Sequence, residues 1–210
     1  MKKGVLFDLD GVLIDTEGQY SIFWSRTGRK YNVGGSTFAD EIKGTNLAKI
    51  LDRFPEEVRE EVRQAIHDYE YEMDYPLFPG ALEFLCQLQE RDVPAAIVTS
   101  SDNVKMNLLY SRHPEIRQYV KAVITGDQVE HSKPAPDGYI KGAADLGIDI
   151  KDCYVFEDSL QGLEAGERSG ATVIGVATTN PRAKVEEMAD YVIDTIADIT
   201  VDRLLSITRR

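Results

Sequence analysis

The 210-residue sequence has an ordinary globular composition, with 42% hydrophobic and 29% charged residues. Its formal net charge of −12 disfavours nucleic acid and anionic membrane surfaces as partners, because like charges repel. No apolar stretch is long enough to predict a membrane span. The first apolar run is interrupted by Asp8, which argues against a signal peptide. We therefore expect a cytoplasmic protein, monomeric by default.

Two cysteines indicate the redox setting. Cys86 and Cys153 both lie in apolar surroundings and lack the spacing of a metal-binding pair. We expect both to be buried free thiols in a reducing compartment.

Six short apolar runs predict the strands of one sheet. In chain order they are GVLF (4–7), PAAIVTS (94–100), KAVITG (121–126), CYVFEDS (153–159), ATVIGVA (171–177) and YVIDT (191–195). None alternates cleanly between apolar and polar residues, so both faces of each strand should be buried, as in a parallel sheet. Helical patterns at 81–90 and 136–147 lie between runs. This alternation predicts an α/β, Rossmann-like fold.

One interval contains helical patterns and no convincing strand. The expected helices are 16–28, ending near Gly28; 46–54; and 55–75, with Pro55 at its first position. In the last helix, Val58, Val62, Ala65, Ile66 and Tyr69 form an apolar stripe, and the acidic face is expected to be solvated. We predict a core domain of residues 1–14 and 77–210 and an inserted helical cap domain of residues 15–76.

The predicted strands end in residues suited to phosphoryl transfer. Ligands of an open α/β sheet bind beyond the carboxyl ends of its strands. The chain places there Asp8 and Asp10, Thr99-Ser100-Ser101, Lys133, and Glu157-Asp158. Four neighbouring carboxylates cannot all stay ionised without a compensating charge. A set of oxygen ligands without His or Cys favours Mg²⁺, which leaves room for a substrate phosphate.

The spacing of Asp8 and Asp10 indicates separate roles. Residues two apart on an extended segment point the same way, so both reach one substrate. Asp8 is expected to ligate the metal and to attack phosphorus, forming an aspartyl-phosphate. Asp10 is expected to act as general acid and then as general base. Gly11 permits the turn that exposes both.

Each motif is weak when it stands alone. DLDG could begin a calcium loop, although its glycine is fourth rather than sixth. Thr99-Ser100-Ser101 is also typical of a cap before a helix starting near Asn103. A single lysine such as Lys133 is usually solvated, and Glu157-Asp158 resembles a helix start. The specificity comes from their common position after strand-like runs.

Taken together, the motifs carry a family resemblance. DLDGVLIDT, VTSSDN, SKPAPDGY and FEDSLQGLEAGERSGATVIGV are similar to the four motifs of the haloacid dehalogenase-like superfamily. The relevant branch contains beta-phosphoglucomutases and small-molecule phosphatases. The resemblance implies that Asp8 is the nucleophile and Asp10 the acid/base. It also implies that Asp8, the Asp10 main-chain carbonyl and Asp158 hold Mg²⁺.

The resemblance assigns further roles in the core. Thr99 is the key position of the second motif, and Lys133 orients the nucleophile and the phosphate. Glu157 belongs to the metal site as its support. Residues 11–14 resemble the family's mobile flap, and the insert resembles the cap that closes over substrate.

Departures from the family pattern favour hydrolysis. The presence of Asp10 points to phosphate chemistry, because dehalogenases and phosphonate-cleaving members lack it. Tyr20 stands where beta-phosphoglucomutases usually carry a histidine, and Asn46 where they place an arginine. A mutase must hold a second phosphate, so these changes favour a phosphatase over a sugar-phosphate mutase. A receiver-type signalling module is a remote third reading.

Substrate recognition is expected from the cap and from the second motif. Gln19, Tyr20 and Trp24 lie about one helical turn apart, and Lys43 and Asn46 flank Gly44. Trp24 is more often cap core, and Lys43 is as readily solvated as functional. We assign substrate binding to Ser100, Ser101, Asn103, Tyr20, Lys43 and Asn46. The predicted protein is a Mg²⁺-dependent phosphatase of a small metabolite, such as a sugar phosphate.

Overall fold

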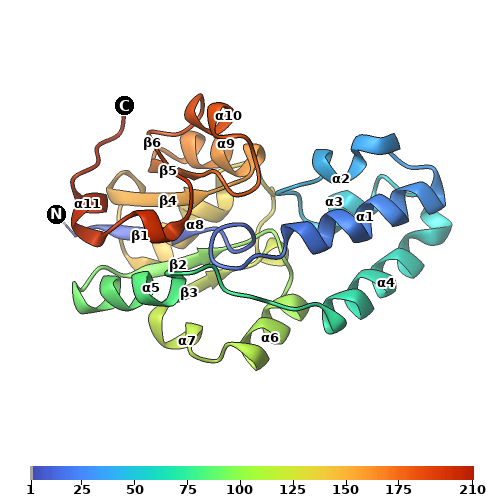
Figure 1. Ribbon diagram of the computed structural model, residues 1–210, viewed down its shortest axis with the longest axis horizontal. Helices are drawn as coiled ribbons and strands as arrows, with labels where there is room; N and C mark the ends of the chain where they lie inside the picture. The colour runs from blue at the N-terminus through green and yellow to red at the C-terminus, as the bar shows by residue number, and fades with distance from the viewer. Residues whose placement is uncertain (1) are drawn as a thin grey trace.

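The computed structural model describes residues 2–210 and contains a six-stranded, fully parallel sheet with helices on both faces. A group of helices extends from one end of the sheet (Figure 1). The strands are β1 (Gly4–Phe7), β2 (Ala95–Val98), β3 (Ala122–Ile124), β4 (Cys153–Glu157), β5 (Thr172–Val176) and β6 (Tyr191–Ile193). This confirms the predicted Rossmann-like α/β core.

The strand order places a ligand-binding crevice at β1. The order is β3-β2-β1-β4-β5-β6, so the chain reverses direction across the sheet between β1 and β4. Such a switch point leaves a crevice at the carboxyl ends of the strands. In register, Phe7 pairs with Ile97 on one side and Phe156 on the other. Asp8 therefore emerges level with Val98 and Glu157.

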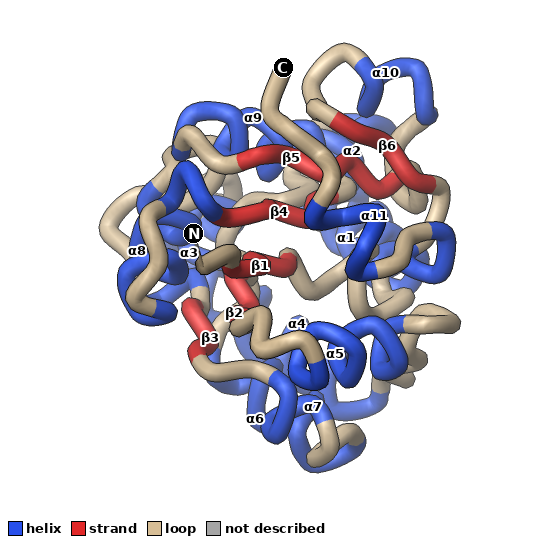
Figure 2. Tube along the Cα trace, turned by 90° about the vertical axis from the view of Figure 1, so that its left-hand side faces the viewer, coloured by secondary structure: helices blue, strands red, loops and turns tan. Residues whose placement is uncertain are grey.

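The absence of alternation in the strands has a packing cause. Every residue of β1, β2, β4 and β5 is buried, because helices cover both faces of the sheet (Figure 2). On one face, Phe7 packs with α5 (Ala81–Glu90), α6 (Asn103–Arg112), α7 (Ile116–Tyr119) and α11 (Val201–Leu205). On the other, Leu6 packs with α8 (Asp137–Leu146) and α9 (Leu160–Ser169), and α10 (Arg182–Glu186) packs beside α9.

The inserted helices have an apolar core of their own. They are α1 (Glu17–Tyr31), α2 (Phe38–Glu41), α3 (Leu47–Leu51) and α4 (Arg59–Glu72). The rings of Trp24, Phe38 and Phe54 pack against one another, two of the three pairs edge to face, near Val62 and Ile66. The chain leaves the sheet beside Ile14 and returns beside Leu77, and these two residues form an antiparallel bridge.

Several local expectations need correction. The first helix does not end near Gly28 but continues to Tyr31, and left-handed Asn32 follows it. Gly28 lies inside the helix because it packs against Phe38: an added Cβ would lie 2.7 Å from that ring. Pro55 precedes a short 3-10 turn, Glu56–Val58, and α4 begins only at Arg59. Ala65 is exposed, so it does not belong to the buried stripe.

The cysteines differ from each other. Both thiols are free, but only Cys153 is buried, whereas Cys86 is half-buried on α5. Burial raises the pKa of the Cys153 thiol to about 12. Across residues 2–210, none of the helices combines the length and the apolar character needed to cross a membrane.

Candidate active site

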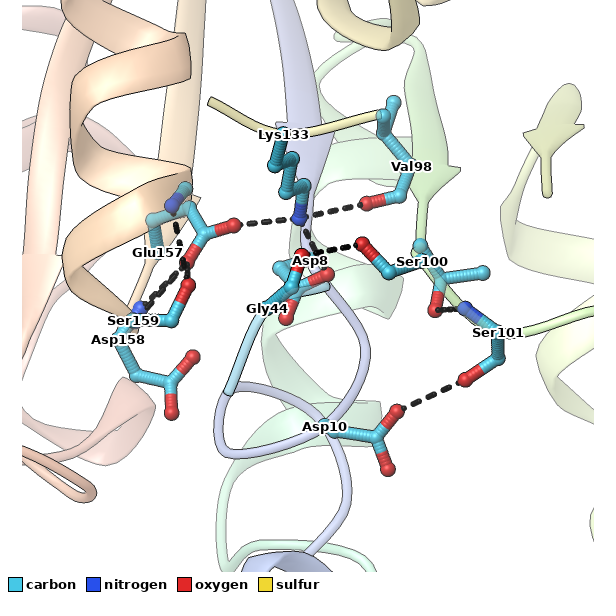
Figure 3. Close-up of polar contacts among 12 residues, drawn as sticks. Asp8, Asp10, Gly44, Val98, Ser100, Ser101, Lys133, Glu157, Asp158 and Ser159 are labelled. Atoms are coloured by element: carbon cyan, nitrogen blue, oxygen red, sulfur yellow. Dashed lines mark hydrogen bonds and ion pairs between the residues drawn. The ribbon is translucent and has the colours of Figure 1, made fainter. Parts of the chain in front are cut away.

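Asp8 lies at the end of β1 within a buried ion-pair network. The Lys133 ammonium donates to Asp8 Oδ1 over 2.7 Å and to the Val98 carbonyl oxygen over 3.3 Å, and it also contacts Glu157 Oε1 (Figure 3). Burial raises the pKa of Asp8 to about 8, although Lys133 opposes the rise. Burial alone would lower the pKa of Lys133, but Asp8 and Glu157 outweigh it and raise that pKa above its usual value.

Glu157 acts as a hub for the network. Its Oε1 accepts hydrogen bonds from Lys133 and from the Tyr139 hydroxyl at 2.8 Å. Its Oε2 accepts from the Asp158 and Ser159 backbone N–H groups and from the Ser159 hydroxyl, each at 3.0 Å. A carboxylate with this many protein donors has little capacity left for another ligand. This arrangement suits a residue that orients Lys133 and Asp158.

Asp158, unlike Glu157, has a carboxylate oxygen that accepts no hydrogen bond from residues 2–210. It is 1% exposed, and its Oδ2 has no hydrogen-bond partner among the described residues. One oxygen from each of Asp8, Glu157 and Asp158 lies within 4.8 Å of the others. Burial and the charges of Glu157 and Asp8 raise the pKa of Asp158 well above its usual range. A buried, unpartnered carboxylate oxygen is costly unless a ligand satisfies it. The Asp8 and Asp158 carboxylates therefore fit a hard divalent cation such as Mg²⁺, with Glu157 as their support.

Asp10 is turned away from Asp8 in this structure (Figure 3). Its Oδ1 contacts the Thr16 hydroxyl and the Lys105 ammonium, and its Oδ2 accepts from the Ser101 hydroxyl at 3.2 Å. Lys105 is 1% exposed, and its ammonium lies 4.4 Å from the centre of the Tyr20 ring. Lys105 was not among the site residues predicted from the sequence. Its one signal was helical spacing with Leu109 and proximity to the second motif.

The hydroxyl cluster joins core and cap. Thr99 Oγ1 accepts from the Ser101 N–H at 3.0 Å, and the Ser100 hydroxyl donates to the Gly44 carbonyl of the cap at 2.7 Å. The residue that caps α6 is Asp102, which accepts from the Lys105 N–H. The hydroxyls of Thr99, Ser100 and Ser101 therefore do not cap α6.

A cavity of about 100 Å³ lies between core and cap. Of the predicted site residues, it is lined by Asp8, Asp10, Tyr20, Lys43, Thr99, Ser100, Ser101 and Asp158. It is also lined by Glu17, Glu70, Asp102 and Lys105, which the sequence analysis did not select. Burial, assisted by the charge of Asp10, raises the pKa of Glu17 to about 7. Glu70 is buried, contrary to the expected solvated acidic face of its helix.

Four predicted site residues do not line this cavity between core and cap. Lys133 contacts Asp8 directly, and Glu157 contacts Lys133; neither of these two residues lines the cavity. The Asn46 side chain caps α3 by accepting from the Lys49 N–H at 3.0 Å. The Asn103 amide donates to Asp127 at 2.6 Å and is exposed. We therefore leave Asn46 and Asn103 out of the substrate contacts proposed below.

Fold and site together define an α/β enzyme core. Its site lies beneath the inserted helices and contains a lysine-paired aspartate, Asp8, beside a carboxylate oxygen of Asp158 that is free to bind a cation. The family model of haloacid dehalogenase-like hydrolases matches residues 5–176. The chain therefore belongs to the haloacid dehalogenase-like hydrolases, as its motifs predicted.

Individual relatives agree with this assignment. Hexitol phosphatase A of Escherichia coli is 29% identical, over 96% of this chain and 94% of its own. The bifunctional riboflavin kinase/FMN phosphatase of Arabidopsis thaliana is 30% identical over 95% of this chain, which spans only 55% of that protein. Beta-phosphoglucomutase of Bacillus subtilis is 26% identical, over 96% of this chain and 93% of its own. A crystal structure of a Pseudomonas syringae hydrolase shares the fold with a TM-score of 0.85 at 21% identity, over 99% of this chain and 100% of its own.

Proposed function

We propose that the protein is a Mg²⁺-dependent phosphatase that hydrolyses a small phosphorylated metabolite through an aspartyl-phosphate. The observation that carries the proposal is the pairing of Asp8 with buried Lys133, beside the unpartnered oxygen of Asp158. That arrangement provides a nucleophile and an open cation ligand in the lining of one cavity, and a fixed positive charge directly behind the nucleophile. The phosphatases among the relatives support hydrolysis.

The chain's own residues account for each proton in two steps. Asp8 attacks phosphorus, the ester P–O bond breaks, and Asp10 gives its proton to the departing alcohol oxygen. A water molecule then attacks the aspartyl-phosphate while Asp10 takes up the proton, which releases inorganic phosphate and restores Asp8. Asp10 must first turn from its contacts with Thr16 and Ser101 toward the reacting oxygen.

Other groups prepare the site for these steps. Lys133 fixes the Asp8 carboxylate, and the Thr99 and Ser100 region offers donors for phosphate oxygens. A Mg²⁺ ion held by Asp8, Asp158 and the Asp10 main-chain carbonyl would neutralise the negative charge of the phosphate and of the acidic residues. The cap covers the cavity and limits access of bulk water.

The test is phosphate release from a panel of esters: glycerol 3-phosphate, sorbitol 6-phosphate, 5′-nucleotides and p-nitrophenyl phosphate. We expect release to require Mg²⁺ and to fall by about 10³-fold or more in Asp8→Asn, because the nucleophile is lost. Asp15→Asn is the matched control, since Asp15 is exposed and close in sequence. Undiminished release by Asp8→Asn, or full activity in EDTA, would contradict the proposal.

The second candidate is a sugar-phosphate mutase, favoured by the similarity to beta-phosphoglucomutase. It predicts conversion of glucose 1-phosphate to glucose 6-phosphate, activation by a bisphosphate and no net phosphate release. The same assays distinguish the two activities. Cytoplasmic location and a monomeric state stay predictions from the sequence.

A further inference from the structure

The cap half of the cavity carries more acid than base. Its lining includes Glu17 and Glu70 from the cap and Asp102 from the core, near Asp10. Two lysines line the same space, and both already have carboxylate partners. Lys105 contacts Asp10, and the Lys43 ammonium lies 3.1 Å from Asp40. A second anionic group on a substrate would therefore face more carboxyl groups than ammonium groups, and neither ammonium is free of a carboxylate partner.

Glu70 lines this region and has one carboxylate oxygen without a partner in the part of the chain that the structure describes. The residue is 7% exposed and lies on α4. Its Oε1 accepts from the Tyr20 hydroxyl at 2.7 Å, whereas its Oε2 has no hydrogen-bond partner among residues 2–210. His67 and Asp102 are close by, but the His67 imidazole bonds to Asp102 at 3.1 Å. Burial raises the pKa of the Glu70 carboxyl.

Much of the remaining cap-side lining is apolar, and Ser21 and Thr45 add two hydroxyl-bearing residues to it. Trp24, Ile42, Leu47, Ile50 and Ile66 supply much of the wall on the cap side. Such a wall packs against C–H groups and makes no demand for charge. Within the described residues, the combination of unpartnered carboxylate oxygens with a largely apolar wall suits a ligand that carries hydroxyls on a carbon skeleton.

We propose that the alcohol portion of the substrate is an uncharged polyol or sugar, and that Glu70 is a specificity-determining residue that accepts a hydrogen bond from one of its hydroxyls. This inference rests on the proposed phosphatase activity and specifies its substrate class. Bisphosphates and phosphorylated carboxylic acids are disfavoured, because their second anion would face Glu17, Glu70 and Asp102.

The test uses three esters of similar size and one reference. Glycerol 3-phosphate carries neutral hydroxyls, 3-phosphoglycerate replaces the terminal CH₂OH by a carboxylate, and propyl phosphate has no free hydroxyl. The reference, p-nitrophenyl phosphate, reports the phosphoryl chemistry. We expect the wild-type kcat/KM for glycerol 3-phosphate to exceed that for each of the other two alkyl esters by about 100-fold or more, because a site built around a hydrogen bond rejects analogues that cannot make it.

The variant Glu70→Gln keeps the size of the side chain and removes its charge. We expect it to reduce the preference for glycerol 3-phosphate over 3-phosphoglycerate by about tenfold or more, while kcat/KM for p-nitrophenyl phosphate stays within about threefold. Glu72→Gln is the matched control, because Glu72 is exposed on the same helix. We expect Glu72→Gln to change neither the preference for glycerol 3-phosphate over 3-phosphoglycerate nor kcat/KM for p-nitrophenyl phosphate. Thermal melting verifies that both variants fold.

The outcomes separate this inference from the proposed function. Equal or better use of 3-phosphoglycerate by the wild type overturns the inference even if Glu70→Gln fails to fold. An equal loss on all four esters in Glu70→Gln also overturns it, since that result indicates a structural role. If no ester releases phosphate in an Asp8-dependent reaction, the proposed function fails, and the inference fails with it.

Discussion

The most informative single residue outside the motifs is Lys105. It is buried on α6, contacts the Asp10 carboxylate and lies over the Tyr20 ring of the cap. It thereby connects the expected general acid/base of the core to a cap helix. A buried lysine with one carboxylate contact is well placed to position that carboxylate, so Lys105 is expected to matter most when the leaving group needs a proton.

Replacing Lys105 by methionine tests that role. We expect kcat/KM for an alkyl phosphate to fall by about 10- to 100-fold, because general acid catalysis contributes about 10²–10⁴-fold and is only partly lost. For p-nitrophenyl phosphate, whose phenolate departs without a proton, the loss should stay below about threefold. Lys121→Met, at an exposed position, is the control. Equal losses on both esters would show that Lys105 does not act through Asp10.

The sequence identified residues that follow strand ends and missed those that depend on tertiary contacts. Asp8, Asp10, Thr99 and Asp158 could be placed together because parallel strands end at one edge of a sheet. Glu70 was grouped with a solvated acidic face, because Glu is rarely buried and its helix carries many acids. Only the docking of α4 against the core distinguishes Glu70 from the exposed acids beside it.

At the scale of the element, the first turn of α9 packs closely against Glu157, which belongs to the ion-pair network of Asp8. Gly162 lies in this turn, and an added Cβ would lie 1.7 Å from Glu157 Oε1. The glycine therefore lets the helix approach the carboxylate that orients Lys133. Neither side of this contact can move without disturbing the Asp8 network.

The substitution Gly162→Ala should therefore destabilise the fold and reduce activity. Overpacking of this kind costs about 1–3 kcal/mol, which lowers the melting temperature by roughly 2–12 °C in a protein of this size. Gly18→Ala is the control: a Cβ on Gly18 of α1 meets nothing within 4 Å. There we expect a gain of about 0.4–1 kcal/mol from reduced freedom of the unfolded chain. Equal melting temperatures for the two variants would refute the packing argument.

Helix ends were the least predictable elements for a related reason. Gly28 commonly marks the end of a helix and Pro55 the start of one. In this structure the helix continues past Gly28, and α4 begins four residues after Pro55. Gly28 permits the close contact with Phe38, and the chain after Pro55 forms a 3-10 turn before α4. The fully buried strands were easier to predict, because their composition alone indicates burial on both faces.

At the scale of the whole molecule, the acidic cluster implies that cation binding and folding are coupled. Mg²⁺ that binds only the folded protein stabilises it, by about 2.7 kcal/mol at 100 times its dissociation constant. We expect Mg²⁺ to raise the melting temperature by roughly 5–11 °C. The increase should be smaller in Asp158→Asn, which weakens the open ligand. An unchanged wild-type melting temperature, or an equal response in Asp158→Asn, would contradict the metal assignment.

The bridge between Ile14 and Leu77 has a consequence for how such proteins diversify. Because the two ends of the intervening segment meet, its length can change without shifting the register of any strand. The segment meets the core again around the cavity, for example where the Ser100 hydroxyl donates to the Gly44 carbonyl and where Lys105 lies over the Tyr20 ring. An insertion or deletion within this segment would therefore alter the wall of the cavity that Tyr20 and Glu70 help to form, while Asp8 and Asp158 stay at the ends of their strands.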